Sequence, residues 1–499
     1  MAVLQQYEKE TAGDCEKYIV QKYTAVCDGS HDTAPYGALS GCAVRLDRMS
    51  GGACSGGSFT GIVCVIPEDN NRARKGKKQM RKLILATESF PYGRGEKTFI
   101  LPEIERLKRY FDITIISHAN REQVEEGMCE ELPEGIRVVC PGRPRLTGFD
   151  KVKALISIFL DRDGRIELKE ILGGRRNKGE RFYQSLAFYA QSQADQKKLR
   201  KSGILNVNEP MTYYSFWYSY FCYSMVREKH RYPNIRMITR THGVDLYHER
   251  IPGGRQPFKH QMEKSLDAIL FACGHAKQYY CTNIRKSLDD GRLYVCRLGT
   301  EKTDVPGEYR RPDAWQMVSC SNVIPLKRVP LIIDALALIE KEKIHWTHIG
   351  DGEQMQYVEQ YAKEKLAGKD NIKYNFTGYM ENSKVIQHYK EHWVDCFITT
   401  SSAEGGCPVS AQEAMKFGIP MIGTAVGGIT EMIRGNGILL SPDPTDEEIA
   451  AAIGKMISYD RETIGAMRDA AIRLWEREFD AESNTRSVLK ILKNAGYAD

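Results

Sequence analysis

SSAEGGCPVSAQEAMKFGIPMIGTAVGGITE, residues 401–431, places two glutamates on either side of a glycine pair, next to a helix-like pattern. The apolar run at 395–400 predicts a short strand, which the following glycines and proline bring to an end. Pro408 suits a first helical turn, and the apolar spacing of 409–417 predicts a helix that stops at Gly418. The pattern therefore predicts a strand, a glycine loop and a helix in that order.

The start of this predicted helix suits a ligand that carries phosphate or sugar oxygens. Helix N-termini present unpaired N–H groups and a partial positive charge, and Gly405 and Gly406 allow close approach to the backbone. Glu404 can accept hydrogen bonds from sugar hydroxyls, and Glu413 can accept them from a ribose. A structural alternative stays open here, in which Glu404 caps the helix and Glu413 lies on its polar face.

Strand and helix patterns alternate across 317–441, which predicts a parallel sheet with helices on both faces. The predicted strands are 317–323, 344–349, 372–377, 395–400, 420–424 and 437–440. Unusual residues lie at or just after their carboxyl ends: Asn322, Lys327, 350–352, 377–379 with Gly378, 404–406 and 426–428. In open parallel sheets ligands bind at that edge, so these loops are expected to line one crevice.

These motifs resemble the glycosyl transferases group 1 family, which comprises retaining glycosyltransferases of family 4 with the two-domain GT-B fold. The family's Glu-x7-Glu segment is similar to Glu404 through Glu413. Its Gly-Ile-Pro-x-Ile strand is similar to 418–422, and its Gly-Gly-x-x-Glu loop to 427–431. The resemblance runs from about Met80 to the C-terminal region and is weakest over 149–206.

Two positions depart from the family pattern. Eight residues, not seven, separate Glu404 from Glu413, and the extra residue is expected to be absorbed in the loop without rotating the helix. The family's Arg-x4-Lys phosphate clamp resembles Asn322 and Lys327, so its arginine is replaced. Lys327 and Arg328 would then neutralise the donor diphosphate.

The N-terminal half shows a second unit of this kind. A buried-strand pattern at 81–87 precedes a loop with Gly93 and Gly95, a helix from about Thr98 and a strand at 111–117. A lone glycine loop is weak evidence. The resemblance implies that this loop faces the reaction centre.

The segments 211–225 and 240–247 are similar to the polysaccharide-assembly branch of the family, which carries a Tyr-Ser-x-Trp segment and an Arg-x-His-Gly-x-Asp-Leu-Tyr motif. A single histidine is more often structural than catalytic, but His242 follows a predicted strand end. We expect His242 to contact the donor sugar.

The resemblance implies a site in which His242, Lys327 and Glu404 act in catalysis. The implied donor-binding residues are Gly93, Gly95, Asn322, Lys327, Arg328, Gly378, Gly405, Gly406, Cys407 and Glu413. It implies a UDP- or GDP-linked sugar as substrate, transfer of a hexose with retention, no metal and no cofactor. The implied fold is α/β GT-B, with two Rossmann-like domains facing across a cleft and a C-terminal helix crossing back to the first.

The domain organisation follows from these patterns. Residues 80–305 are expected to form an acceptor domain, completed by the helix at about 480–499, and 306–479 a nucleotide-sugar donor domain. Residues 1–79 lack sustained periodicity, and we expect a disordered extension or an artefact of start-site choice. A small appended module is the alternative.

Composition is that of a soluble globular protein, with 42% hydrophobic residues and a net charge of +6. No stretch is long and apolar enough to predict a membrane span, and no signal peptide is evident. Fourteen cysteines without metal-type spacing predict reduced thiols. These features favour a cytoplasmic protein, which can still work at the inner face of a membrane.

The segment 151–205 holds thirteen Lys and Arg against six Asp and Glu, a local excess of positive charge. This excess favours an anionic partner, either a membrane surface or a lipid-diphosphate acceptor; the alternative is that the charges only form a solvated helical face. Nucleic acid is disfavoured because no binding motif accompanies the charges. Asp161 and Asp163 match a metal-binding Asp-x-Asp, but we expect them to lie on a solvated face and assign no metal.

Three functions remain open from the sequence. The first is transfer of a sugar to a lipid-linked or polysaccharide acceptor in cell-surface polysaccharide biosynthesis. The second is a catalytically silent nucleotide-sugar binder or assembly protein, suggested by Asn322 and the altered glutamate spacing. The third is a sugar-nucleotide epimerase of the same architecture.

Overall fold

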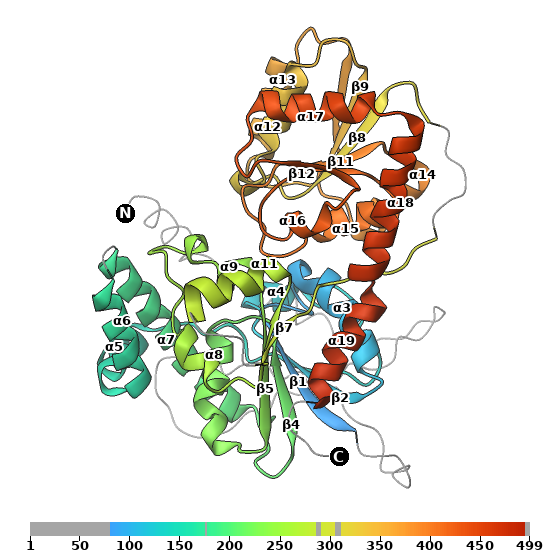
Figure 1. Ribbon diagram of the computed structural model, residues 1–499. Helices are drawn as coiled ribbons and strands as arrows, with labels where there is room; N and C mark the ends of the chain where they lie inside the picture. The colour runs from blue at the N-terminus through green and yellow to red at the C-terminus, as the bar shows by residue number, and fades with distance from the viewer. Residues whose placement is uncertain (1–79, 175–176, 286–290, 305–310, 495–499) are drawn as a thin grey trace, which may run out of the picture. The chain divides into compact units, whose positions relative to one another are not determined.

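Two parallel sheets form the framework of the protein in the computed structural model, which describes residues 80–174, 177–285, 291–304 and 311–494 (Figure 1). The predicted extension 1–79 lies outside these residues. The first sheet holds β1 (Arg81–Thr87), β2 (Phe111–Ser117), β3 (Arg137–Val139), β4 (Met211–Ser215), β5 (Ile235–Thr241), β6 (Ala268–Phe271) and β7 (Leu293–Val295). The second holds β8 (Trp315–Cys320), β9 (Ile344–Ile349), β10 (Ile372–Phe376), β11 (Cys396–Thr399), β12 (Met421–Thr424) and β13 (Gly437–Leu440).

Helices connect the strands within each sheet. Around the first sheet lie α3 (Lys97–Leu107), α4 (Arg121–Glu126), α5 (Gly148–Leu160), α6 (Arg162–Gly173), α7 (Lys178–Lys201), α8 (Tyr220–Glu228), α9 (Gly243–Leu246), α10 (Lys259–Glu263) and α11 (Gly274–Tyr279). The second sheet carries α12 (Val329–Ala337), α13 (Met355–Lys365), α14 (Asn382–Glu391), α15 (Val409–Lys416), α16 (Ile429–Met432) and α17 (Asp446–Ser458). The chain continues with α18 (Arg461–Glu478) and α19 (Ala481–Asn494).

Both faces of each sheet are buried at its central strands, which explains why strands such as β1 read as apolar runs, whereas the edge strand β10 has exposed residues on one face. In β1, Leu83 and Leu85 belong to one hydrophobic cluster, whereas Ile84 and Ala86 belong to another. Successive side chains of a strand point to opposite faces, so the two clusters mark two covered faces. Helix-covered parallel sheets, as predicted, are therefore confirmed.

The strand order places a topological switch point in each sheet. The first sheet has the order β3-β2-β1-β4-β5-β6-β7 and the second β10-β9-β8-β11-β12-β13, with all pairs parallel. The order reverses between β1 and β4, and between β8 and β11. Ligands of such sheets bind beyond the carboxyl ends of the strands at this point. The loops after these four strands are thus the place to look for a site.

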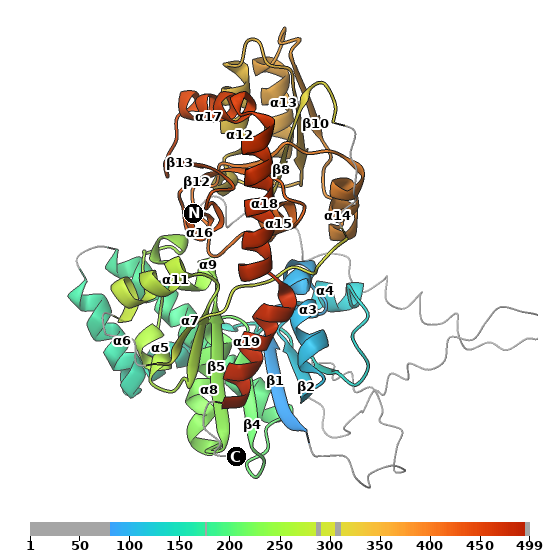
Figure 2. The ribbon, with the colours of Figure 1, turned by 45° about the vertical axis from the view of Figure 1, so that its right-hand side comes forward.

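The C-terminal region returns to the first sheet, as predicted. The helix expected at about 480–499 is α19, which begins after Asp480, and the Asp480 carboxylate caps it by accepting the Ser483 amide at 2.8 Å. α19 packs against α3, and the Leu492 carbonyl accepts a hydrogen bond from Arg236 at 2.7 Å (Figures 1 and 2). The predicted domain boundary at 305 falls outside the described residues and stays a prediction.

The Asp161 and Asp163 pair does not lie on a simply solvated face, so that expectation was wrong. Asp161 accepts hydrogen bonds from Tyr189 at 3.0 Å and from Arg227 at 2.5 Å, and Asp163 accepts one from Tyr223 at 3.3 Å. Both carboxylates are half-buried. They join the start of α6 to α7 and α8.

Candidate functional site

The loop between β11 and α15 carries the candidate site. Its Glu404 carboxylate accepts a hydrogen bond from the Lys327 ammonium at 2.5 Å, and the two side chains are 11% and 19% exposed. Lys327 ends the short 3-10 helix Pro325–Lys327 after β8. The two loops at the switch point of the second sheet are therefore joined by one partly buried ion pair. Pro408 directly precedes α15 as its N-cap and does not lie in the first turn.

The Gly-Gly-x-x-Glu loop, 427–431, packs against the backbone of residues 404–406. A Cβ atom at Gly427 would lie 1.9 Å from the Glu404 carbonyl oxygen, and one at Gly428 would lie 2.3 Å from the Gly406 carbonyl oxygen. Gly427 also has φ +49°, a left-handed conformation that favours glycine. Only residues without a side chain allow the two loops to approach this closely.

A cavity of about 150 Å³ opens in front of the loop. The residues 404–409 line one side, and His242, Gly243, Phe99 and Leu298 line the other. The cavity has more apolar than polar surface, which suits the ring face of a sugar more than a bare phosphate. The structure thus brings together five of the predicted residues: His242, Glu404, Gly405, Gly406 and Cys407.

His242 is held in a fixed orientation at the end of β5. Its Nε2 lies 3.0 Å from the Phe216 carbonyl oxygen, and its ring centroid lies 4.3 Å from that of Trp217. Burial, helped by the positive charge of Arg240, lowers the pKa of His242 to about 3. The imidazole is therefore neutral at physiological pH, and it can serve as a hydrogen-bonding group but not as a cation. Contact with a donor sugar stays a prediction.

Glu96 organises the glycine loop after β1, and the sequence argument missed it. Its carboxylate accepts hydrogen bonds from the backbone amides of Glu88, Ser89 and Phe90 at 2.6–3.0 Å, and from Trp217 Nε1 at 2.6 Å. The same Trp217 ring packs against His242. Glu96 thereby ties the first loop to the histidine. The available signal was an acidic residue at the N-cap position of α3.

The remaining predicted residues do not line the cavity, and their roles stay predictions. Gly93 is packed against Ser89, whereas a Cβ atom at Gly95 would meet open space. Gly378 has φ +67°, and its carbonyl accepts the Gly350 amide at 3.0 Å. Asn322 is exposed.

Arg328 and Glu413 have partners within the protein. Arg328 donates hydrogen bonds to the Thr400 carbonyl at 2.7 Å and to Asp443 at 2.6 Å, so it fixes the end of β11. Glu413 is buried and accepts a hydrogen bond from Asn382 at 2.5 Å. Burial raises the pKa of the Glu413 carboxyl, although the Asn382 contact opposes this.

Comparison with known proteins identifies the second sheet region. Residues 302–473 match the family model of Glycosyl transferases group 1. The chain carries a glycosyl transferases group 1 domain. O-antigen biosynthesis glycosyltransferase WbnH of Escherichia coli is 30% identical over 130 residues, which cover 26% of this chain and 34% of that protein. The match therefore spans about a third of this relative's length.

Solved structures place this domain in a larger fold. The apo form of lipopolysaccharide outer core galactosyltransferase WaaB is 15% identical with a TM-score of 0.57, covering 82% of this chain and 99% of WaaB. Anabaena Alr3699/HepE in complex with UDP is 14% identical with a TM-score of 0.56, covering 83% and 99%. These likenesses confirm the predicted GT-B architecture around the glycosyl transferases group 1 domain.

Proposed function

We propose that the protein is a retaining glycosyltransferase that moves a hexose from a UDP- or GDP-sugar to a lipid-linked or polysaccharide acceptor in cell-surface polysaccharide biosynthesis. One observation carries the proposal: Lys327, Glu404 and the Gly405–Gly406 backbone converge beside a cavity that His242 also lines. The family match, the O-antigen relative WbnH and the UDP complex of HepE support the same class of donor and pathway.

The chemistry follows from where charge develops. As the bond between the anomeric carbon and the phosphate oxygen breaks, the diphosphate gains negative charge and the sugar gains positive character. The Lys327 ammonium and the amides at the start of α15 are suited to stabilise the diphosphate. The acceptor oxygen bonds to the anomeric carbon on the same face, and its proton passes to the departing phosphate oxygen. This route assigns no step to a metal or a cofactor.

The proposed setting is the inner face of an anionic membrane. α5 exposes Phe149, Ile156 and Leu160 by 76%, 59% and 73% respectively, and the exposed Lys151 and Lys153 flank them. Apolar side chains beside cations suit an interface of anionic lipids. Among the described helices, none combines the length and apolar character needed to cross a bilayer. Cosedimentation with phosphatidylglycerol vesicles, compared with phosphatidylcholine vesicles, tests this contact. Equal binding to the two kinds of vesicle, or binding to neither, would contradict it.

Donor turnover tests the main proposal. The purified protein is incubated with a panel of UDP- and GDP-sugars and a lipid extract as acceptor, and nucleotide release is measured. We expect release with one donor, and a loss of about 100-fold or more in Lys327→Met because one charge-stabilising group is removed. Lys373→Met changes an exposed lysine on β10 and serves as the matched control. Binding of UDP without release under any condition would favour the silent-binder alternative.

A further inference from the structure

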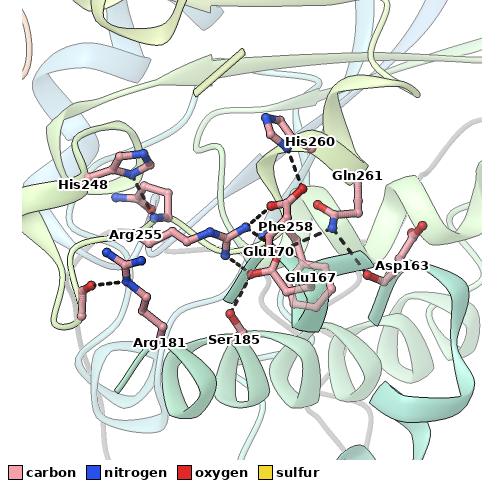
Figure 3. A network of polar contacts seen from close by, with 12 residues as sticks. Asp163, Glu167, Glu170, Arg181, Ser185, His248, Arg255, Phe258, His260 and Gln261 are labelled. Carbon is pink, nitrogen blue, oxygen red and sulfur yellow. Dashed lines mark hydrogen bonds and ion pairs between the residues drawn. The ribbon is translucent and has the colours of Figure 1, made fainter. Parts of the chain in front are cut away.

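Buried carboxylates tie together loops and helices around the first sheet. Figure 3 shows one of them, Glu167, which accepts hydrogen bonds from Ser185 at 2.7 Å and from Arg255. These contacts join α6 to α7 and to the segment before α10, next to a cavity of about 180 Å³ that Arg255 lines. The cavity of about 150 Å³ beside Glu404, called here the Glu404 cavity, has a different set of lining residues. A second buried carboxylate, that of Glu96, is linked to two of those residues.

Glu96 lies at the N-cap position of α3 and is only 3% exposed, but its carboxylate turns back to the loop after β1. One oxygen accepts hydrogen bonds from the Glu88 amide at 3.0 Å and from Trp217 Nε1 at 2.6 Å. The other accepts the Ser89 and Phe90 amides at 2.6 and 2.8 Å. Burial of a carboxylate is costly unless hydrogen bonds replace its contacts with water. With these N–H donors on both of its oxygens, the carboxylate is fixed in one orientation.

The segment 216–218, directly after β4, connects Glu96 to His242. The Trp217 ring, held by Glu96, lies 4.3 Å from the His242 ring between centroids, and the Phe216 carbonyl oxygen lies 3.0 Å from His242 Nε2. The next residue of the segment, Tyr218, donates its amide to the Asp245 carboxylate at 2.7 Å. That carboxylate also accepts the His242 amide at 2.6 Å. The segment therefore holds both the ring and the backbone of His242.

The start of α3 is the other element that Glu96 fixes. Phe99 follows Glu96 by three residues, so it lies about one helical turn further along. Its side chain lines the Glu404 cavity on the same side as His242, opposite residues 404–409. An aromatic side chain beside a hydrogen-bonding imidazole suits a sugar, which has an apolar ring face and polar hydroxyls. One buried carboxylate thus connects two groups of the cavity wall that are far apart in the sequence.

We propose that Glu96 is a positioning residue for the proposed sugar transfer. Its carboxylate holds His242, through Trp217, and Phe99, through the start of α3, in one arrangement beside the donor sugar. This inference rests on the proposed function and adds to it a residue that acts through its neighbours. Both Glu96 oxygens already accept N–H groups, so the carboxylate is not the base or the nucleophile of the reaction. Its effect on the rate comes from alignment, because a misplacement of about 1 Å can cost about 100-fold.

Glu96→Gln tests the proposal with the smallest change of shape. An amide has one acceptor oxygen and one NH2 group, so in either orientation two N–H groups of the protein would face the NH2 donor. We expect kcat for nucleotide release from the sugar donor to fall about 10- to 100-fold. The Kd of UDP, measured by calorimetry, should stay at the wild-type value, because Lys327 and the Gly405–Gly406 backbone belong to loops of the second sheet. A wild-type kcat in folded Glu96→Gln would overturn the proposal.

Ser185→Ala and Trp217→Phe complete the set of variants. Ser185→Ala removes a hydrogen bond from the other buried carboxylate, Glu167, so it should lower the melting temperature and keep the wild-type kcat. Trp217→Phe keeps an aromatic ring but removes the Nε1–H that Glu96 accepts, so it should also lower kcat at unchanged UDP affinity, even if Glu96→Gln does not fold. The double variant of Glu96 and Trp217 should lose no more than Glu96→Gln alone. A loss equal to the product of the two single losses would overturn the route through Trp217.

A magnetic resonance signal of His242 provides a readout that does not depend on turnover. Histidine labelled with ¹³C at Cε1 gives this signal, and its absence in His242→Asn assigns it. The Trp217 ring is close enough to shift the signal, so Glu96→Gln should move it and Ser185→Ala should not. An unmoved signal in folded Glu96→Gln would overturn the positioning of His242. If the wild type releases nucleotide from no sugar donor but the signal moves in Glu96→Gln, the proposed transferase function fails and the link from Glu96 to His242 stands.

Discussion

Substitution of Gly427 by alanine is the sharpest test of how the loop 400–408 between β11 and α15, here called the donor loop, is held. The new Cβ atom would lie 1.9 Å from the Glu404 carbonyl oxygen, whereas real Cβ contacts essentially never fall below 3.0 Å. The Glu404 backbone must therefore retreat by roughly 1 Å, a displacement that typically costs about 100-fold in rate. The left-handed φ of +49° adds about 1–2 kcal/mol of strain, and the overpacking adds about 1–3 kcal/mol.

Gly435 provides a matched control. It also has a positive φ, of +80°, but a Cβ atom there would meet no other atom within 4 Å. Gly435→Ala should therefore lose only about 1–2 kcal/mol of stability through strain and keep the wild-type rate. The difference between the two variants isolates the steric effect on the donor loop.

The assay combines urea unfolding with steady-state nucleotide release from the sugar donor. We expect Gly427→Ala to be folded at low temperature, to unfold at lower urea concentration than Gly435→Ala, and to turn over about 100-fold more slowly. Wild-type turnover in Gly427→Ala would refute the idea that this contact positions Glu404. Equal loss of turnover in both variants would show that backbone strain alone explains the effect.

Three further predictions concern charge. Glu404→Gln should bind UDP more tightly, because it releases Lys327 from its ion pair, and should transfer sugar more slowly, which calorimetry and nucleotide release measure together. Asn322→Arg should raise UDP affinity by about tenfold if the exposed side chain reaches the diphosphate, and unchanged affinity would contradict a clamp at this position. Burial lowers the pKa of His118, but Asp195, 3.0 Å away, together with the Thr87 carbonyl and Glu96 outweighs this and leaves the pKa raised. The protonated His118 therefore stabilises the fold fully below a pH of about 6.5, and this stabilisation is lost as pH rises through the folded-state pKa. The urea midpoint of the wild type should fall over that pH range, and His118→Gln should reduce this fall.

The second sheet was predictable because its strands are local patterns. Predicted strands at 344–349 and 437–440 match β9 and β13 at both ends, since short segments rich in large apolar residues between turn residues leave a clear signal in the sequence. The glycine loop before α15 was equally clear, because its turn chemistry is local.

The contacts between distant residues could not be predicted. Glu167 and Arg255 lie 88 positions apart and pair only because α6 packs beside the segment that precedes α10. Likewise, Glu96 and Trp217 are 121 positions apart. Charges in such positions look like solvated surface in the sequence, because periodicity gives no information about which partner they will meet. Sequence patterns located the site through its backbone, whereas its electrostatics required the structure.

The ion pair between Lys327 and Glu404 suggests how a site without the clamp arginine can still accept a diphosphate. Neither side chain is more than one-fifth exposed, so an unpaired Lys327 would bear a desolvation penalty in the absence of donor. Glu404 removes that penalty, and an arriving phosphate then replaces one anionic partner of Lys327 by another. The freed carboxylate remains beside Gly405 and can accept a hydroxyl of the donor sugar. If the protein has the proposed transferase function, donor binding is an exchange of partners, in which a single lysine is sufficient and the glutamate is released at the place where the sugar arrives.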